Sequence, residues 1–408
     1  MNATVVLDGP YSWFRLAVSV LAATVVSVGM WSVVLVLPQV QAEFGVGRGD
    51  ASLPYTATMV GFALGNLLLG RLVDRFGLAT VLVCAALSLA TGFTLAAYAT
   101  NIWVFALAQG LLIGSGAAAG FAPLLADISH WFHRRRGIAV AAGASGNYLA
   151  GAIWPLLLRD VIIEDGWRQA YLIIAATCVL MIVPLALMLR RRMPLSAMAA
   201  GAPGGPSVPL DSGFSPRTLA LLLALAGVGC CVAMAMPQVH IVALCVDLGH
   251  GMAAGAEMLS VMLFAGIVSR LVSGFLADLI GGIRTLLIGS VLQGMALVLY
   301  LPFEGLGALY LVSLIFGLSQ GGIVPSYAII VREYLPAREA GERIGFVIMA
   351  TIVGMALGGW MSGWIFDMTG SYQMALLNGI AWNALNVGIV VVILLRTRGP
   401  GVRAAVPA

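Results

Sequence analysis

Long apolar segments alternate with short polar ones along almost the whole chain. Each apolar segment extends for about 20 residues, the length that an α-helix needs to cross the hydrocarbon core of a bilayer. Polar and apolar residues do not alternate within them, as the strands of a β-barrel would require. The pattern predicts an all-α membrane protein with twelve transmembrane helices, at residues 14–38, 51–71, 78–98, 102–128, 136–158, 169–189, 218–244, 258–279, 284–302, 307–331, 343–365 and 373–395.

One polar stretch, residues 190–217, is longer than the others and rich in proline and glycine. It has no helical periodicity, so we expect a flexible cytoplasmic linker. On either side of it lie an N-terminal six-helix half, residues 1–189, and a C-terminal six-helix half, residues 218–408.

The two halves resemble each other in sequence. Gly70 and Asp74, which follow the second apolar segment, recur 204 residues later as Gly274 and Asp278, which follow the eighth. A parallel repeat of six-helix units predicts two pseudo-symmetric halves with a substrate site between them, near the middle of the membrane.

Composition narrows the class of protein. Hydrophobic residues make up 61% of the 408 residues and charged residues 9%, too few charges to cover the surface of a soluble protein. The net charge of +4 does not indicate a nucleic-acid partner, because the basic residues belong to loops. The five cysteines lack metal-ligand spacing and no Walker loop is present, so we expect no metal, no cofactor and no ATP-driven transport.

The arginines predict the orientation in the membrane. All 21 basic residues are arginines. With the N-terminus placed in the cytoplasm, seventeen of them lie inside and three, Arg48, Arg159 and Arg168, lie outside. This positive-inside bias predicts a multi-pass protein of a bacterial-type inner membrane with both termini cytoplasmic. The first apolar segment is too long for a signal peptide, so we expect it to remain as a transmembrane helix.

Arg270 lies near the middle of the eighth apolar segment. A charge at that depth costs about 2.5–3.5 kcal/mol even on lenient insertion scales. Its helical neighbours, Gly266, Ile267, Ser273 and Gly274, include no acid, so no local ion pair neutralises it. The guanidinium therefore needs a counterion on another helix or on a ligand, and an anionic substrate is the sharper interpretation. The alternative is a structural salt bridge or a cap on carbonyl groups.

The segment Gly70–Gly77 resembles the signature loop between the second and third helices of the major facilitator superfamily, and Gly274–Gly281 repeats it weakly. The segments Pro237–Gly249 and Trp131–Gly137, and the spacing of Arg270 before Asp278, resemble the branch of monocarboxylate transporters and oxalate–formate antiporters.

This resemblance implies a secondary transporter that works by alternating access as a monomer. It also implies a cytoplasmic gate formed by Asp74, Arg75 and Asp278, with Gly70 and Gly274 beside them. The eleventh segment lacks the second cation that dicarboxylate exchangers of this branch carry there, which favours a substrate with one carboxylate. Lactate, pyruvate, a short fatty acid and an aromatic acid all fit, driven by protons or by anion exchange.

Several further residues are candidates for substrate or proton handling. His240 lies on the seventh segment and titrates near neutral pH in its ordinary state. Asp247 lies two turns along the same face and is a possible partner in a proton step. Asn66 is the repeat-related counterpart of Arg270. The aromatic candidates for the walls of the cavity are Trp31, Phe121, Tyr148, Tyr327 and Trp360.

Two alternatives stay open at the level of sequence. One is an efflux pump for amphipathic compounds with the same fold, in which Arg270 would be paired within the protein. The other is an intramembrane serine hydrolase that uses Ser145, suggested by Gly143-Ala-Ser-Gly146. The absence of a strand-to-helix elbow argues against the hydrolase, so we expect no enzyme.

Overall fold

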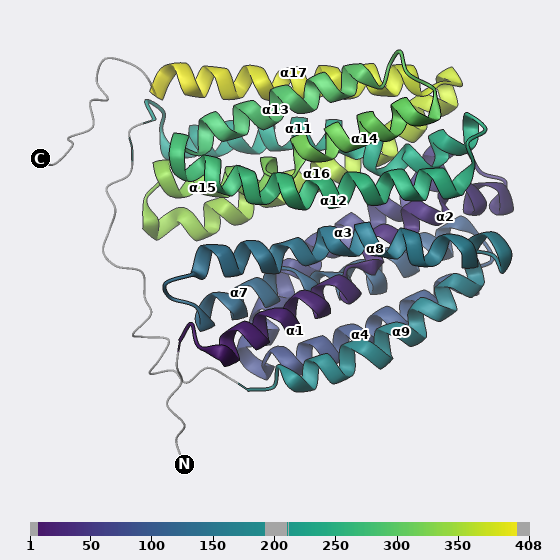
Figure 1. Ribbon diagram of the computed structural model, residues 1–408, viewed down its shortest axis with the longest axis horizontal. Helices are drawn as coiled ribbons and strands as arrows, with labels where there is room; N and C mark the ends of the chain where they lie inside the picture. Colours follow the sequence, from purple (N-terminus) through teal and green to yellow (C-terminus); the bar gives the residue numbers. More distant parts are fainter. Residues whose placement is uncertain (1–6, 192–209, 211, 398–408) are drawn as a thin grey trace, which may run out of the picture.

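The computed structural model describes residues 7–191, 210 and 212–397. Most of the predicted linker, and the predicted cytoplasmic ends of the chain, lie outside the described residues. The described residues form long helices that run roughly parallel to the long axis of the molecule (Figure 1).

The N-terminal half contains six long helical units. They are α1 and α2 (Pro10–Val26 and Val28–Phe44), α3 (Arg48–Phe76), α4 (Leu78–Ala97), α5 to α7 (Ile102–Leu107 through Ala122–Trp131), α8 (Arg136–Glu164) and α9 (Trp167–Met188). The C-terminal half contains six more. They are α11 (Pro216–Asp247), α12 (Gly251–Ile280), α13 (Gly282–Leu299), α14 and α15 (Leu306–Gln320 and Ile323–Tyr334), α16 (Ala337–Thr369) and α17 (Tyr372–Thr397).

The predicted fold is confirmed, since each of the twelve predicted segments corresponds to one of these units. Eleven units in the described part of the chain are long and apolar enough to cross a membrane. The remaining unit, α8, has 29 residues and the same length as α3, but its centre carries glycine, serine and asparagine. Most units are longer than predicted, because their helices continue past the apolar core into polar residues at both ends.

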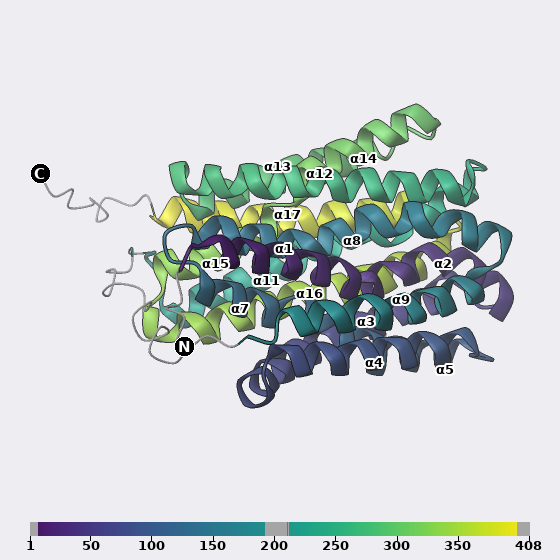
Figure 2. The ribbon, with the colours of Figure 1, turned by 60° about the horizontal axis from the view of Figure 1, so that its bottom comes forward.

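The two halves form separate bundles that pack against each other. In Figure 1, α1 to α9 form the lower bundle and α11 to α17 the upper one, and Figure 2 shows that the helices of both bundles run along the same long axis. Between the bundles α3 contacts α16, α8 contacts α12, and α2 contacts α11. The start of α1, the end of α9, the start of α11 and the end of α17 share one end of the molecule (Figure 1), which we call the linker end. The opposite end, which carries the loop between α2 and α3, is the far end.

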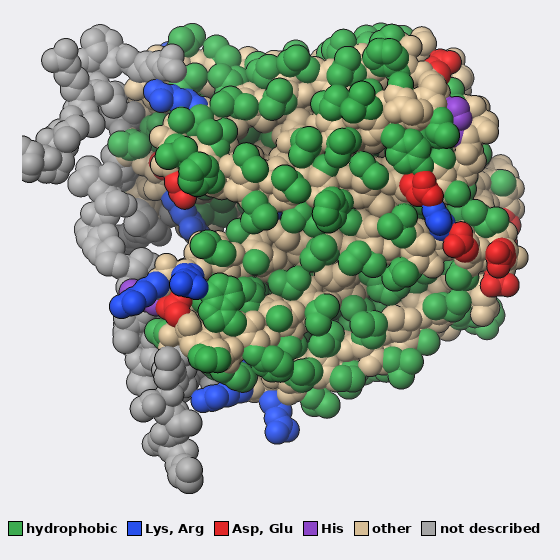
Figure 3. Space-filling model, viewed as in Figure 1, with side chains coloured by type: hydrophobic (Ala, Val, Ile, Leu, Met, Phe, Trp, Pro, Cys, Tyr) green, Lys and Arg blue, Asp and Glu red, His purple; other side chains and the backbone are tan. Residues whose placement is uncertain are grey.

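Charge is distributed along the long axis as the sequence pattern requires. On the face shown in Figure 3, apolar side chains cover the middle of the molecule, and charged side chains gather at its two ends. Most of the arginines visible there lie towards the linker end, and most of the visible acids lie towards the far end. An apolar band between two charged ends is the surface that a bilayer-spanning protein needs.

The fourth and tenth spans are both interrupted near their middle. In the fourth, a π-helical turn, Ala108–Gly114, leads to a short break at Phe121, whose backbone (φ −121°, ψ −94°) is not helical. In the tenth, Gly321 and Gly322 separate α14 from α15. Pro123 stands in the first turn of the helix after its break, where its missing N–H costs no hydrogen bond. The breaks therefore occupy repeat-related positions in the two halves.

Close approach of helices depends on glycine at particular positions. A Cβ atom on Gly61 of α3 would lie 1.8 Å from the carbonyl oxygen of Gly110, and one on Gly321 would lie 2.0 Å from the carbonyl oxygen of Gly266 on α12. No other residue fits at such distances, so these glycines bring the backbones of neighbouring helices into contact.

The first described residues are fixed to the loop between α7 and α8. The carboxylate of Asp8 accepts hydrogen bonds from the backbone N–H groups of His133, Arg134 and Arg135 at 3.0–3.2 Å. Partial burial acts to raise the pKa of Asp8, but these N–H groups favour the charged form, and the net effect lowers the pKa.

Candidate functional site

Arg270 on α12 lies at the boundary between the halves. Its Nη1 atom donates a hydrogen bond to the carbonyl oxygen of Ala144 on α8 at 2.8 Å, and Nε donates to that of Gly321 at 3.3 Å. Its guanidinium carbon lies 4.3 Å from the centre of the Tyr148 ring, also on α8. Among the described residues no acidic side chain forms an ion pair with it. The positive charge is therefore held in place by dipoles and a ring face, without a neutralising carboxylate.

Glycine makes room for this arrangement. A Cβ atom on Gly266, one turn before Arg270, would lie 2.4 Å from the Tyr148 ring, and one on Gly321 would lie 3.0 Å from the backbone nitrogen of Arg270. Because both positions are glycine, α8, α12 and the break of the tenth span approach each other around the guanidinium. A guanidinium has five N–H donors, of which these two carbonyl groups use two.

Asn66 on α3 occupies the repeat-related position and makes a related contact. Its Oδ1 atom accepts a hydrogen bond from the N–H of Ala122, at the break of the fourth span, at 3.3 Å. Its Nδ2 atom donates to the carbonyl oxygen of Phe62 at 2.8 Å. Arg270 also contacts the break in its own half, but as a donor, to the carbonyl oxygen of Gly321. Each half thus ties its interrupted helix to the neighbouring span, and only the C-terminal half does so with a charge.

The aromatic candidates fall into two groups. Tyr148 contacts Arg270, and Trp31 packs on the same helix as Tyr148: its indole donates to the carbonyl oxygen of Asn147 at 3.0 Å, and its side chain and that of Leu263 lie at Gly151. Phe121, Trp360 and Tyr327 lie elsewhere. The ring of Phe121 lies 6.0 Å from that of Phe62, Trp360 stacks on Trp364, and the hydroxyl of Tyr327 donates to Asn386 inside the C-terminal half.

Tyr327 is fully buried among α15 and α17, so its hydroxyl is not directed to the boundary between the halves. We therefore leave it, and Asn66 with its two satisfied polar groups, out of the site around Arg270.

His240 on α11 is part of a different cluster, at the far end. Its ring is fully buried, with Nδ1 3.0 Å from the hydroxyl of Tyr372 and Nε2 2.8 Å from the carbonyl oxygen of Gly359. The helix continues through Pro237 to Asp247, three residues beyond the predicted end of the span at residue 244. His240 and Asp247 are nevertheless not direct partners, because Tyr372 and Arg48 stand between them.

Arg48, at the start of α3, joins the two halves at this end. Its Nη1 atom donates to the Tyr372 hydroxyl at 2.7 Å, and Nη2 donates to Asp247 at 3.0 Å. In addition, the backbone N–H groups of Arg48 and Gly49 donate to the carboxylate of Asp367 at the end of α16, at 2.6 and 2.7 Å. We call Arg48, Asp247, Asp367 and Tyr372 the far-end lock.

Sequence reasoning placed Arg48 in an outer loop and gave no role to Asp367 or Tyr372. The sequence does place an arginine and acids at the same membrane depth, which is a signal for ion pairing. It does not say which of the loops at that depth meet in space. A second ion pair between the halves, from Arg159 on α8 to Glu257 on α12, also lies at the far end.

The predicted gate residues at the linker end are not engaged with one another. Asp74 and Arg75 at the end of α3, and Asp278 on α12, are exposed and form no ion pair within the described residues. A Cβ atom on Gly70 or Gly274 would meet nothing within 4 Å. On the face shown in Figure 3, the surface is hollowed between the halves near the linker end and continuous towards the far end.

Ser145 has no serine-hydrolase geometry in this structure. Its hydroxyl donates to the carbonyl oxygen of Ala141, one turn earlier on α8, at 2.9 Å. None of the described histidines hydrogen-bonds to it. Four cysteines, Cys178, Cys230, Cys231 and Cys245, are buried free thiols, whereas Cys84 on α4 is exposed.

Two repeat-related six-helix halves, joined at one end by ion pairs and separated at the other, define a membrane transporter of the two-bundle type. The chain belongs to the Major Facilitator Superfamily, whose family model matches residues 19–256 and 221–407.

Relatives with this architecture include monocarboxylate transporters. Monocarboxylate transporter 13 of Bos taurus is 29% identical over 348 residues, which cover 84% of this chain and 78% of the relative. Monocarboxylate transporter 11 of Homo sapiens is 29% identical over 396 residues, covering 91% and 80%. These similarities confirm the resemblance to the monocarboxylate transporter branch.

A solved structure supports the fold independently. A bacterial homologue of the human lysosomal transporter Spinster, in an inward-facing and unoccupied conformation, superposes with a TM-score of 0.70. The alignment covers 95% of this chain and 97% of the other at 14% identity, so it supports the fold alone.

Proposed function

We propose that this protein is a secondary transporter of a small organic monocarboxylate, with Arg270 as the anchor of the carboxylate. The observation that carries the proposal is a guanidinium at the boundary between the halves with no acidic partner among the described residues. The names of the relatives, monocarboxylate transporters 11 and 13, support the substrate class.

The chemistry of the site fits an acid with one charged end. A guanidinium holds a carboxylate through two parallel hydrogen bonds, which fix its orientation as well as its charge. Tyr148 and Trp31 offer apolar ring surface for the organic part of the substrate. The counterpart of Arg270 in the other half is the neutral Asn66, so a second carboxylate would lie unpaired in a poorly solvated cavity. Short dicarboxylates are therefore poor substrates.

The two ends of the molecule suggest the transport cycle. In this structure the far-end lock closes the outer side, and the linker end, which we assign to the cytoplasm from the positive-inside bias, is open. In the opposite state Arg48 parts from Asp247 and Tyr372, and Asp74, Arg75 and Asp278 close the linker end. Glycines at positions 70 and 274 leave space for that approach. Rocking of two bundles about a central site is alternating access.

Proton coupling is assigned to His240. Both of its ring nitrogens are occupied while the far end is closed, so it exchanges no proton with solvent in this state. Because Tyr372 binds both His240 and Arg48, opening of the lock frees the histidine on the outer side. His240 then takes up a proton, and Asp247, released from Arg48, becomes available as its partner. One proton would cross with one monocarboxylate, without net charge movement.

A thermal-shift experiment tests this proposal. The purified protein is heated with lactate, pyruvate, butyrate or benzoate and, separately, with the methyl ester of each acid. A ligand that binds only the native state raises the apparent melting temperature. We expect at least one acid to do so, its ester not to, and the Arg270→Gln variant to respond to neither.

The same experiment distinguishes the proposed monocarboxylate transporter from the runner-up function. An efflux pump for amphipathic compounds, or a structural role for Arg270, is favoured by the two carbonyl groups that already bind the guanidinium. In that case the esters stabilise the protein as well as the acids do, and Arg270→Gln responds like the wild type. An anion exchanger would instead respond to the acids like the proposed symporter but transport them only in exchange.

A further inference from the structure

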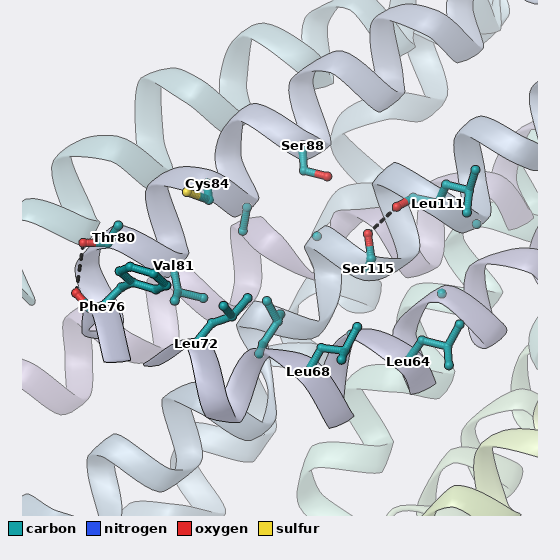
Figure 4. Close-up of a pocket in the computed structure, with 16 residues that line it drawn as sticks. Leu64, Leu68, Leu72, Phe76, Thr80, Val81, Cys84, Ser88, Leu111 and Ser115 are labelled. Atoms are coloured by element: carbon teal, nitrogen blue, oxygen red, sulfur yellow. Dashed lines mark hydrogen bonds between the residues drawn. The ribbon is translucent and has the colours of Figure 1, made fainter. Parts of the chain in front are cut away.

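A groove opens on the membrane-facing surface of the N-terminal half, outside the site around Arg270. It has a volume of about 540 Å³ and runs between α3, α4 and the π-helical turn of the fourth span. Leu64, Leu68 and Leu72, one turn apart on α3, line one wall, and Figure 4 shows them directed towards the opposite wall, where Cys84 and Ser88 stand on α4. The lining is almost entirely apolar.

Small residues create the groove. Gly61 and Gly65 of α3, Gly110 and Gly116 of the fourth span, and Ala85 of α4 form its floor. The two serine hydroxyls that line the groove bind carbonyl groups of the π-helical turn: Ser88 on α4 donates to Leu112 at 2.9 Å, and Ser115 donates to Leu111. No hydrogen-bonding group is therefore needed from whatever occupies the depth of the groove, and an apolar chain fits it.

The groove reaches the linker end, where two arginines flank it. Phe76 and Thr80, at the junction of α3 and α4, are its last lining residues. Arg71 and Arg75 follow Leu68 by three and seven positions, which keeps them on the same side of α3. Both are exposed, and the Arg75 guanidinium lies 5.2 Å from the centre of the Phe76 ring. An apolar slot in the membrane thus ends beside two cations at the depth of the headgroups.

The internal repeat provides a matched comparison. A smaller groove of about 260 Å³ lies at the related position between α12, α13 and α14, where Val268, Val272 and Leu276 replace the three leucines. The positions of Arg71 and Arg75 are taken there by Phe275 and Leu279, and a single arginine, Arg284, stands where Thr80 does. The larger volume and the pair of arginines therefore distinguish the N-terminal groove from its repeat-related counterpart.

We propose that the N-terminal groove binds one anionic phospholipid of the leaflet at the linker end, with an acyl chain along Leu64, Leu68 and Leu72 and the phosphate between Arg71 and Arg75. The apolar lining fits the chain, and the exposed cations complement the headgroup. Each arginine contributes about fivefold to the affinity for an anionic over a zwitterionic headgroup.

Cys84 provides a direct readout, because its thiol lines the groove and is exposed, whereas the other four thiols are buried. The full-length protein in detergent is mixed with phosphatidylglycerol or, at the same mole fraction, with phosphatidylethanolamine. The rate of alkylation of Cys84 by N-ethylmaleimide is then measured by mass spectrometry. We expect phosphatidylglycerol to slow alkylation at about 25-fold lower concentration than phosphatidylethanolamine does.

The double substitution Arg71→Gln/Arg75→Gln removes this preference, and Arg284→Gln at the other groove keeps it. Native mass spectrometry gives a second measurement: Cys84→Trp, which fills the groove, loses bound phosphatidylglycerol, and Ile288→Trp, at the related position in the smaller groove, retains it. Equal protection by the two lipids in the wild type, or a preference that survives the double substitution, would overturn the proposal. Equal protection by glycerophosphoglycerol, which has no acyl chains, would also overturn it in favour of a free anion.

Discussion

Arg48 on α3 and Asp247 on α11 form an ion pair at 3.0 Å across the boundary between the two halves. The same guanidinium binds Tyr372, and the same helix start binds Asp367, so one short segment of the N-terminal half holds three elements of the C-terminal half. Hydrogen bonds to charged groups contribute about 1.5–3 kcal/mol each. Their combined loss is large enough to shift a two-state equilibrium between inward-open and outward-open forms.

We predict that Arg48→Gln opens the far end. Losing two charge-assisted bonds should raise the outward-open population by at least tenfold. Asp165 and Glu304 are exposed on far-end loops of opposite halves. Spin labels on cysteines that replace them report the opening as a longer distance, measured by double electron–electron resonance. Arg343→Gln, which breaks an exposed pair within α16, serves as the control and leaves the distance unchanged. An unchanged distance in Arg48→Gln would show that the lock does not hold the far end closed.

Gly321, at the break of the tenth span, and Gly274, on α12, should respond in opposite ways to substitution by alanine. Gly321→Ala places a Cβ atom 2.0 Å from the carbonyl oxygen of Gly266 and should destabilise the protein by about 1–3 kcal/mol through overpacking. Gly274→Ala meets open space and should be neutral or stabilising by up to about 1 kcal/mol, since alanine favours a helix interior. Thermal unfolding in detergent, followed by tryptophan fluorescence, measures both. Equal melting temperatures would contradict the close packing around the break of the tenth span.

The sequence predicted the twelve spans, the repeat and the unpaired central arginine, because each of these is recorded in local pattern or in spacing. It did not predict the far-end lock, since Arg48 lies 319 and 324 positions before Asp367 and Tyr372, and only the packing of one bundle against the other brings them together. Tyr327 shows a second limit. The break at Gly321 and Gly322 sets the rotation of α15, and the sequence does not give the angle that turns Tyr327 towards Asn386 instead of the boundary.

His240→Gln should separate two modes of transport. Glutamine keeps a polar side chain but does not titrate, so uptake driven by a pH gradient should be lost while exchange of substrate across the membrane persists. Both modes are measured in the same proteoliposomes with a labelled acid, and His250→Gln, at a half-buried histidine of the far end, is the control. If His240→Gln still accumulates the acid with the pH profile of the wild type, the proton is carried elsewhere.

Asp8→Asn should weaken the attachment of the first described residues to the loop before α8. The lowered pKa of Asp8 means that the charged carboxylate stabilises the folded form. This stabilisation is complete above the ordinary carboxyl pKa of about 3.9 and is lost as the pH falls through the lower folded value. The difference in melting temperature between wild type and variant should therefore be constant from pH 8 to about pH 5 and shrink below it. A difference that grows on acidification would contradict the assigned direction.

The most direct measurement is exchange of labelled acid by Arg270→Gln. Proteoliposomes loaded with lactate, pyruvate, butyrate or benzoate are placed in the same labelled acid, and counterflow is followed for wild type, Arg270→Gln and Arg284→Gln. Glutamine at position 270 removes the charge and the planar fork, so exchange should fall by about 100-fold or more for every acid that the wild type carries. Arg284→Gln, an arginine in the first turn of α13 in the same half, should exchange at the wild-type rate. Counterflow by a folded Arg270→Gln variant at the wild-type rate would contradict the assignment of Arg270 as the carboxylate anchor.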